Sequence, residues 1–198
     1  NHIFMGVETI VPIMTANSPQ FIVEPPQESD TSSDYANAIQ RILSILYETT
    51  DVRTSGESLV RHMIIYRMGV WKAYWDVKSN NVALKTIHPK KIFIPKNTID
   101  IVYLIEKQDI PAQDFRDTFG DEVFKKFLDY KGKKNKEDKL DEIGGVFSTL
   151  EFWTADYVFW TDENKGFVIK KMKNPYYDFE NKDKNHFETP KIPYIIAS

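Results

Sequence analysis

The sequence contains no cysteine and only four histidines. The absence of cysteine excludes disulfide scaffolds, thiolate-ligated zinc sites and cysteine nucleophiles together. The histidines, His2, His62, His88 and His186, do not pair at a spacing that places two imidazoles on one helix face. The sequence therefore predicts no histidine-based metal site.

Long apolar runs and the common ligand-binding motifs are also missing. No apolar run approaches the ~18 residues that a membrane-crossing helix needs, and the apolar start lacks the basic segment of a secretory signal. The eight glycines form no G-x-x-x-x-G-K-[ST], G-x-G-x-x-G or G-x-S-x-G pattern. We therefore expect no enzyme activity, with no catalytic, cofactor-binding or metal residue, no cofactor and no membrane partner.

Aromatic and aliphatic residues supply the material for a core. Of 198 residues, 41% are hydrophobic, and 13 Phe, 10 Tyr and 4 Trp are present; each aromatic ring can bury about 150–250 Å². The net charge of −3 gives no general attraction to phosphate backbones. A role in binding nucleic acid would have to be local or indirect.

Residues 1–69 are expected to be mainly helical. Apolar residues at helical spacing between residues 3 and 14 predict a first helix that stops at the Asn-Ser-Pro of 17–19. A second helix is expected at about Ser33 to Thr50 and a third at about Gly56 to Met68. Gly69 stands where the C-cap glycine of the third helix belongs.

Residues 70–198 are expected to be mainly β. The alternation in "GVWKAYWD", residues 69–76, predicts a strand that packs against the third helix. Residues 82–95 are the expected hairpin partner, on an irregular or edge path because of Pro89 and Pro95. The apolar run within 98–110 predicts a strand buried on both faces.

A surface helix near 111–128 interrupts this β region. Its phenylalanines recur at helical spacing, and Gly120 is a point at which the helix divides. Residues 146–160 and 166–173 predict two long strands of one hairpin. For the Lys-rich stretch 131–145, which mixes both charges, we favour a solvated loop over a docking loop.

These elements predict an α+β fold for 1–198 as a single region. Apolar N-terminal helices are expected to pack against a mostly antiparallel, hairpin-rich sheet, with one surface helix inserted. Because the first residue is not Met and "KIPYIIAS" ends on an apolar run, we expect the chain to be a piece of a longer one.

The strongest candidate for catalysis is the pair Asp76 and Lys78 in "YWDVK". In Mg²⁺-dependent nucleases, a carboxylate holds the metal and a lysine orients the attacking water. The motif also needs a second carboxylate on a neighbouring strand, whereas helices precede it here and Asp51 falls in a turn. We therefore rank a nuclease below a structural role. For His88, we favour a buried or loop position over catalysis.

The four tryptophans offer a second kind of site, because indole rings can stack on bases or sugars. Trp71, Trp75, Trp153 and Trp160 all occur within alternating strands. We favour core packing for them.

The order of these segments resembles the tailed-bacteriophage portal proteins. The opening "NHIFMGVETIVPIMTANSPQFIVEPP" holds a "VETIVP" run and a P-x-F-x-V-x-P extension, and "LVRHMIIYRMGVWKAYWD" follows. "VALKTIHPKKIFIP" is similar to the strand of that family in which a residue-Pro pair precedes an apolar run. Late in the chain, "LEFWTADYVFW", "NPYYDF" and "NHFETPKIPYIIAS" are similar to its closing segments.

The resemblance implies the wing region of a subunit of a ring, usually dodecameric, at one vertex of the capsid. Double-stranded DNA passes through such a ring during packaging and ejection. The implied partners are further copies of the chain, the major capsid protein, and the terminase and head-completion proteins, which bind through regions outside this chain. The implied location is the virion, and the host cytoplasm during assembly. Another virion assembly or adaptor protein is the main alternative.

Overall fold

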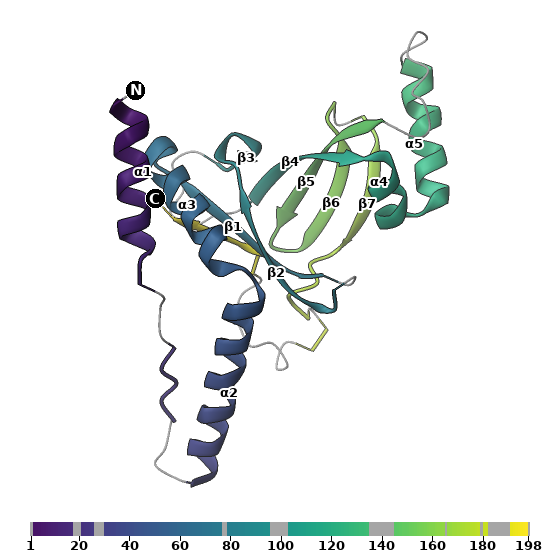
Figure 1. Ribbon diagram of the computed structural model, residues 1–198. Coiled ribbons are helices and arrows are strands. Elements are labelled where there is room, and N and C mark those ends of the chain that lie inside the picture. Colours follow the sequence, from purple (N-terminus) through teal and green to yellow (C-terminus); the bar gives the residue numbers. More distant parts are fainter. Residues whose placement is uncertain are drawn as a thin grey trace. The chain divides into compact units, whose positions relative to one another are not determined.

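The computed structural model describes residues 2–17, 21–25, 30–76, 79–95, 103–134, 145–164, 166–178, 180–181 and 191–197. Within these ranges the chain forms five α-helices and two antiparallel sheets, which confirms the α+β class (Figure 1). The chain was expected to form a single region. It divides into two compact units, one of Asn1–Pro89 with Pro193–Ser198 and one of Lys90–Ile192.

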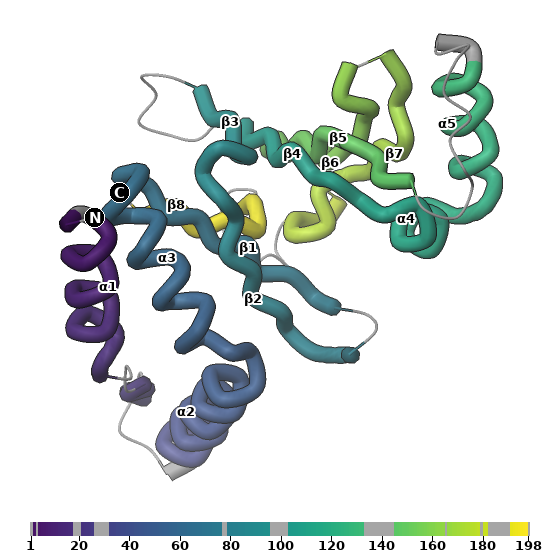
Figure 2. The backbone as a smooth tube through the Cα atoms, turned by 45° about the horizontal axis from the view of Figure 1, so that its top comes forward, coloured from purple at the N-terminus to yellow at the C-terminus, as the bar shows by residue number. Residues whose placement is uncertain are grey.

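Three helices open the first unit: α1 (His2–Thr15), α2 (Asp30–Thr49) and α3 (Val52–Tyr66). Helices α1 and α3 lie side by side (Figures 1 and 2). Val7 and Val11 of α1 are buried. Glu8 accepts two hydrogen bonds from Arg61 of α3, at 3.0 Å from Nε and 3.0 Å from Nη2. This bidentate ion pair, together with the buried valines, holds α1 against α3.

Helices α2 and α3 begin earlier than the sequence predicted, at Asp30 and Val52. A break was expected over residues 51–56, but only Thr50 and Asp51 separate the two helices. Asp51 has a left-handed backbone with φ 50°. One left-handed residue is enough to end one helix and start the next, and Asp tolerates that conformation better than most residues.

The prediction that Gly69 caps α3 is wrong. Arg67 holds the left-handed cap position, with φ 56°, and its N–H donates to the carbonyl of Met63 at 2.8 Å. Gly69 instead begins β1 (Gly69–Asp76). A Cβ atom at Gly69 would lie 2.6 Å from Leu59 Cδ1 and 2.8 Å from Met63 Cγ. Glycine is needed here for close packing of β1 on α3.

The first unit has a three-stranded sheet in the order β2-β1-β8, with β2 at Asn81–Ile87 and β8 at Tyr194–Ala197. Trp71 of β1 pairs with Thr86 of β2, and its Nε1 donates to Thr86 Oγ1 at 3.1 Å. The same Nε1 donates to the carbonyl of Ser55 in α3 at 3.3 Å. The predicted packing of this strand on the third helix is confirmed.

The second unit has a five-stranded antiparallel sheet in the order β3-β4-β5-β6-β7. Its strands are β3 (Ile92–Phe93), β4 (Tyr103–Pro111), β5 (Val146–Thr154), β6 (Tyr157–Asp162) and β7 (Val168–Lys173). Strands β2 and β3 are both edge strands, and Pro89 lies in a short 3₁₀ turn between them, Pro89–Lys91. The edge path expected from the prolines is confirmed.

Two predictions for the second unit are wrong. Residues 146–160 form two strands, β5 and β6, because the chain reverses at 155–156, where the N–H of Tyr157 donates to Thr154 Oγ1 at 3.0 Å. Strand β4 is not buried on both faces, because Leu104 and Glu106 are buried while Tyr103 is 41% exposed. Residues 101–102, where the apolar run begins, lie outside the described residues.

Two helices pack on this sheet: α4 (Ala112–Phe119) and α5 (Asp121–Lys134). The break predicted at Gly120 is confirmed, and this residue has φ 88°. Phe115 and Phe127 are fully buried, with ring centroids 5.0 Å apart, and each contacts Phe147 of β5, at 5.3 and 5.2 Å. The expected helix near 111–128 is thus present and extends to Lys134.

The turn between β6 and β7 is built around Asp162, which is completely buried. Its Oδ1 accepts from the backbone N–H groups of Gly166 and Phe167, at 2.7 and 2.8 Å. Its Oδ2 accepts from the N–H of Asn164 at 3.2 Å and from the Tyr130 hydroxyl at 3.4 Å. A buried carboxylate with this set of donors holds a turn in place.

Candidate interaction surface

The residues predicted for catalysis do not come together as a described site. Asp76 ends β1, and its Oδ2 accepts from the hydroxyl of Ser79 at 2.7 Å, which orders the turn into β2. Lys78 lies outside the described residues. Asp51 lies in the turn between α2 and α3. The carboxylate of Asp76 therefore has a structural use in the hairpin.

An imidazole cluster forms where the sequence predicted isolated histidines. The ring of His88 lies 5.0 Å from that of His62 and 4.9 Å from that of Tyr66 on α3, measured between centroids. Burial, with smaller contributions from His88 and Arg61, lowers the pKa of His62. Its Nδ1 is buried and has no hydrogen-bond partner in the described structure. Because Tyr66 follows His62 by one helical turn while His88 comes from the end of β2, no local pattern marks this cluster.

Three of the four tryptophans are used in packing. Trp153 is 4% exposed, stacks on Tyr176 at 5.7 Å, and donates to Glu151 Oε1. Trp160 packs against Phe119 of α4 at 5.7 Å, and Trp71 joins β1 to α3. Trp75 differs, because it is 55% exposed. Core packing was predicted for all four, and for Trp75 that prediction is wrong.

Two glutamates on neighbouring strands are buried, a feature that the sequence reasoning missed. Glu106 of β4 lies directly opposite Glu151 of β5, and both are 3% exposed. Gln108 Nε2 and Trp153 Nε1 donate to the two oxygens of Glu151. Across the ranges that the structure describes, no group of three or more His, Cys, Asp or Glu residues could hold a metal ion. Glu151 is thus held by hydrogen bonds from two neighbouring side chains in the sheet.

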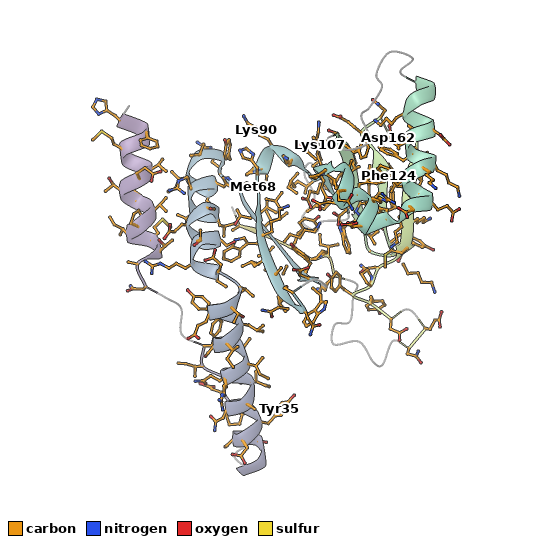
Figure 3. All side chains as sticks on the ribbon, turned by 45° about the vertical axis from the view of Figure 1, so that its right-hand side comes forward. Tyr35, Met68, Lys90, Lys107, Phe124 and Asp162 are labelled. Atoms are coloured by element: carbon orange, nitrogen blue, oxygen red, sulfur yellow. The ribbon has the colours of Figure 1, made fainter. Side chains whose placement is uncertain are left out.

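The first unit carries an unusual apolar surface on α1. We call Met5, Ile10, Ile13 and Met14 the α1 surface. They are 63%, 44%, 70% and 59% exposed, and Phe4, which precedes Met5 in the sequence, is 62% exposed. Figure 3 shows side chains standing out from α1. Apart from His2 at its start, the one ionisable residue in this helix is Glu8, which pairs with Arg61. The α1 surface thus exposes large apolar side chains and no charge.

Helix α2 exposes a second apolar strip on the same unit. We call Tyr35, Ala38, Ile42 and Ile45 the α2 seam; all four are exposed. Ile42 is 56% exposed, Ile45 50%, and Tyr35, labelled in Figure 3, 69%. Another part of α2 is covered by residues 21–25, since Phe21 contacts Tyr47 at 5.8 Å and the N–H of Val23 donates to Gln40 Oε1 at 3.2 Å.

The α2 seam has a regular spacing. Its residues follow one another by three, four and three positions, which is the spacing of a helix–helix contact. Amphipathic periodicity identified α2 as a helix but could not separate positions that pack within the unit from those left exposed. The seam is therefore a candidate binding site for another helix.

No described helix is both long enough and apolar enough to cross a membrane. The Lys-rich stretch weighed as a docking loop lies mostly outside the described residues, at 135–144. Comparison of the chain with protein-family models and with curated proteins gives no match.

Proposed function

We propose that the chain is a structural subunit of a phage portal ring, in the wing region of the subunit. The observation that carries the proposal is the pair of uncharged apolar surfaces on α1 and α2. A protein that works as a monomer rarely exposes such surfaces, whereas a subunit of a closed assembly buries them against its neighbours. The order of sequence motifs resembling portal proteins agrees with this role.

Asp76, the carboxylate weighed for catalysis, and two buried acidic residues have structural uses. Asp76 orders a hairpin turn, Asp162 orders the turn after β6, and Glu151 holds Trp153 and Gln108. These uses support a stiff structural body over an enzyme. Under the nuclease alternative, Asp76→Ala would abolish Mg²⁺-dependent cleavage of DNA; under our proposal, wild type and variant both leave DNA intact.

The proposed partners follow from the ring. Further copies of the chain form a dodecamer, the major capsid protein surrounds it, and the terminase and head-completion proteins bind through other regions. Double-stranded DNA passes through the channel. The proposed locations are the virion and, during assembly, the host cytoplasm.

Light scattering on the protein at its full natural length tests the proposal. We expect a single large species whose mass is a fixed multiple of the subunit mass and does not change on dilution over the working range. A monomer at every concentration contradicts the proposal and favours an adaptor or another assembly protein.

A further inference from the structure

We propose that the α1 surface of one copy packs against the α2 seam of the next copy. This inference rests on the proposed ring and names the contact that joins its subunits. The two surfaces lie on different helices of the same unit, so each copy offers one of each to its two neighbours.

The chemistry of α1 selects a protein partner. Helices that lie on a membrane surface carry Lys and Arg on their polar face, and binding to nucleic acid needs basic side chains. Helix α1 contains neither Lys nor Arg. Its exposed side chains, led by Ile13 at 70% and Met5 at 63%, fit an apolar protein surface.

The spacing on both helices fits a helix–helix contact. Gly6 is exposed next to Met5 of the α1 surface, and Gly6, Ile10 and Ile13 follow one another by four and three positions. The α2 seam has the same kind of spacing. No atom lies within 4 Å of the position that a Cβ would occupy at Gly6. A neighbouring helix can therefore approach α1 closely at this point, as small residues allow.

The charges beside the α2 seam disfavour pairing of the seam with itself. Asp34, Arg41 and Glu48 follow one flank of the seam at seven-residue intervals. Two antiparallel α2 helices that overlap along the whole seam would place Arg41 opposite its own copy and Asp34 near Glu48, both of which are like-charge contacts. Helix α1 has one carboxylate, Glu8, and it is already paired with Arg61.

The arrangement also meets the geometric requirement of a ring. A contact between two identical patches closes after two copies, whereas a contact between two different patches passes from copy to copy. Packing of the α1 surface on the α2 seam is of the second kind.

Cysteine cross-linking tests the pairing directly, because the chain has no cysteine of its own. Ile13→Cys and Ile42→Cys variants are made in the full-length protein, with any cysteine outside residues 1–198 replaced by serine. One variant has a mass tag, and the two are mixed during assembly and mildly oxidised. A disulfide requires the two Cα atoms to come within about 7 Å. We expect a mixed dimer of tagged and untagged chains as the main product.

The matched control replaces Ile42→Cys by Ser44→Cys, since Ser44 is exposed on α2 outside the seam. This mixture is expected to give no more than a small fraction of the cross-linked product. Dimers formed mainly by Ile13→Cys with itself, or by Ile42→Cys with itself, would overturn the inference. Intact rings without any cross-link would also overturn the proposed contact, but they would not contradict the proposed ring. Absence of rings from the wild-type protein would instead contradict the proposed function.

Discussion

At Gly69, β1 and α3 approach each other closely. We expect Gly69→Ala to lower the free energy of unfolding of the first unit by about 1–3 kcal/mol, because the new methyl group overpacks the interior. It would lie 2.6 to 2.9 Å from side-chain atoms of Leu59 and Met63, which must move. Urea denaturation followed by tryptophan fluorescence, to which Trp71 contributes, measures the loss.

Gly56→Ala is the matched control for that experiment. Gly56 lies within α3, and the nearest atom to an added Cβ is Trp71 Cζ2 at an ordinary 3.9 Å. Alanine is the better helix former by about 0.8–1 kcal/mol, so this variant should be as stable as the wild type or more so. Equal stability losses in the two variants would contradict the close-approach explanation.

His62 predicts a dependence of stability on pH. Burial and the neighbouring His88 and Arg61 lower its pKa below the ordinary value of 6.5, so the unfolded chain binds the proton more readily than the folded one. Stability is therefore greatest above about pH 6.5 and falls as the pH drops through that value. Urea midpoints measured from pH 7.5 to pH 5 should decrease.

Replacing His62→Gln should flatten that decrease, since the titrating group is removed. His2→Gln, which changes an exposed histidine at the start of α1, should leave the decrease unchanged. If wild type and His62→Gln lose stability in parallel on acidification, His62 does not account for the pH dependence.

At the scale of elements, Gly120 joins α4 to α5. Its φ of 88° is a conformation that side chains with a Cβ rarely adopt. We expect Gly120→Ala to destabilise the second unit by about 1–3 kcal/mol through backbone strain. Thermal unfolding monitored by circular dichroism measures this effect.

Gly132→Ala provides the comparison, because Gly132 lies within α5 and an added Cβ meets no atom within 4 Å. This variant should unfold at the same temperature as the wild type or slightly higher. A lower unfolding temperature for Gly132→Ala than for Gly120→Ala would show that strain at the joint is not the controlling factor.

Elements marked by residues close together in the sequence were predicted correctly. Phenylalanines at helical spacing and a glycine between them predicted α4 and α5, and prolines predicted the edge strands. The turn at 155–156 was missed because "TAD" lies within a long alternating run, where Asp156 is the one turn-favouring residue and neither Gly nor Pro is present. Gly69 was misassigned because capping and close approach both select glycine, and only the positions of Leu59 and Met63 distinguish them.

The candidate surface was harder to predict, because it depends on which apolar residues remain uncovered. The periodicities of α1 and α2 are those of ordinary packed helices. Exposure of Ile13 and Ile42 follows from how α3 and residues 21–25 cover the other sides of these helices. The pairing of His62 with His88 likewise depends on tertiary contact.

At the scale of the whole molecule, the two apolar surfaces predict an assembly that resists salt. Contacts between uncharged surfaces are not screened by ions, whereas charged interfaces weaken as ionic strength rises. We expect the assembled mass to stay constant between about 0.1 and 1 M NaCl, as measured by sedimentation velocity. Dissociation at high salt would indicate an interface dominated by charge.

Negative-stain imaging of the full-length protein, expressed alone, tests the central claim most directly. We expect closed rings of uniform size with a central channel wide enough for duplex DNA. Monomers, or open filaments without a channel, would contradict it.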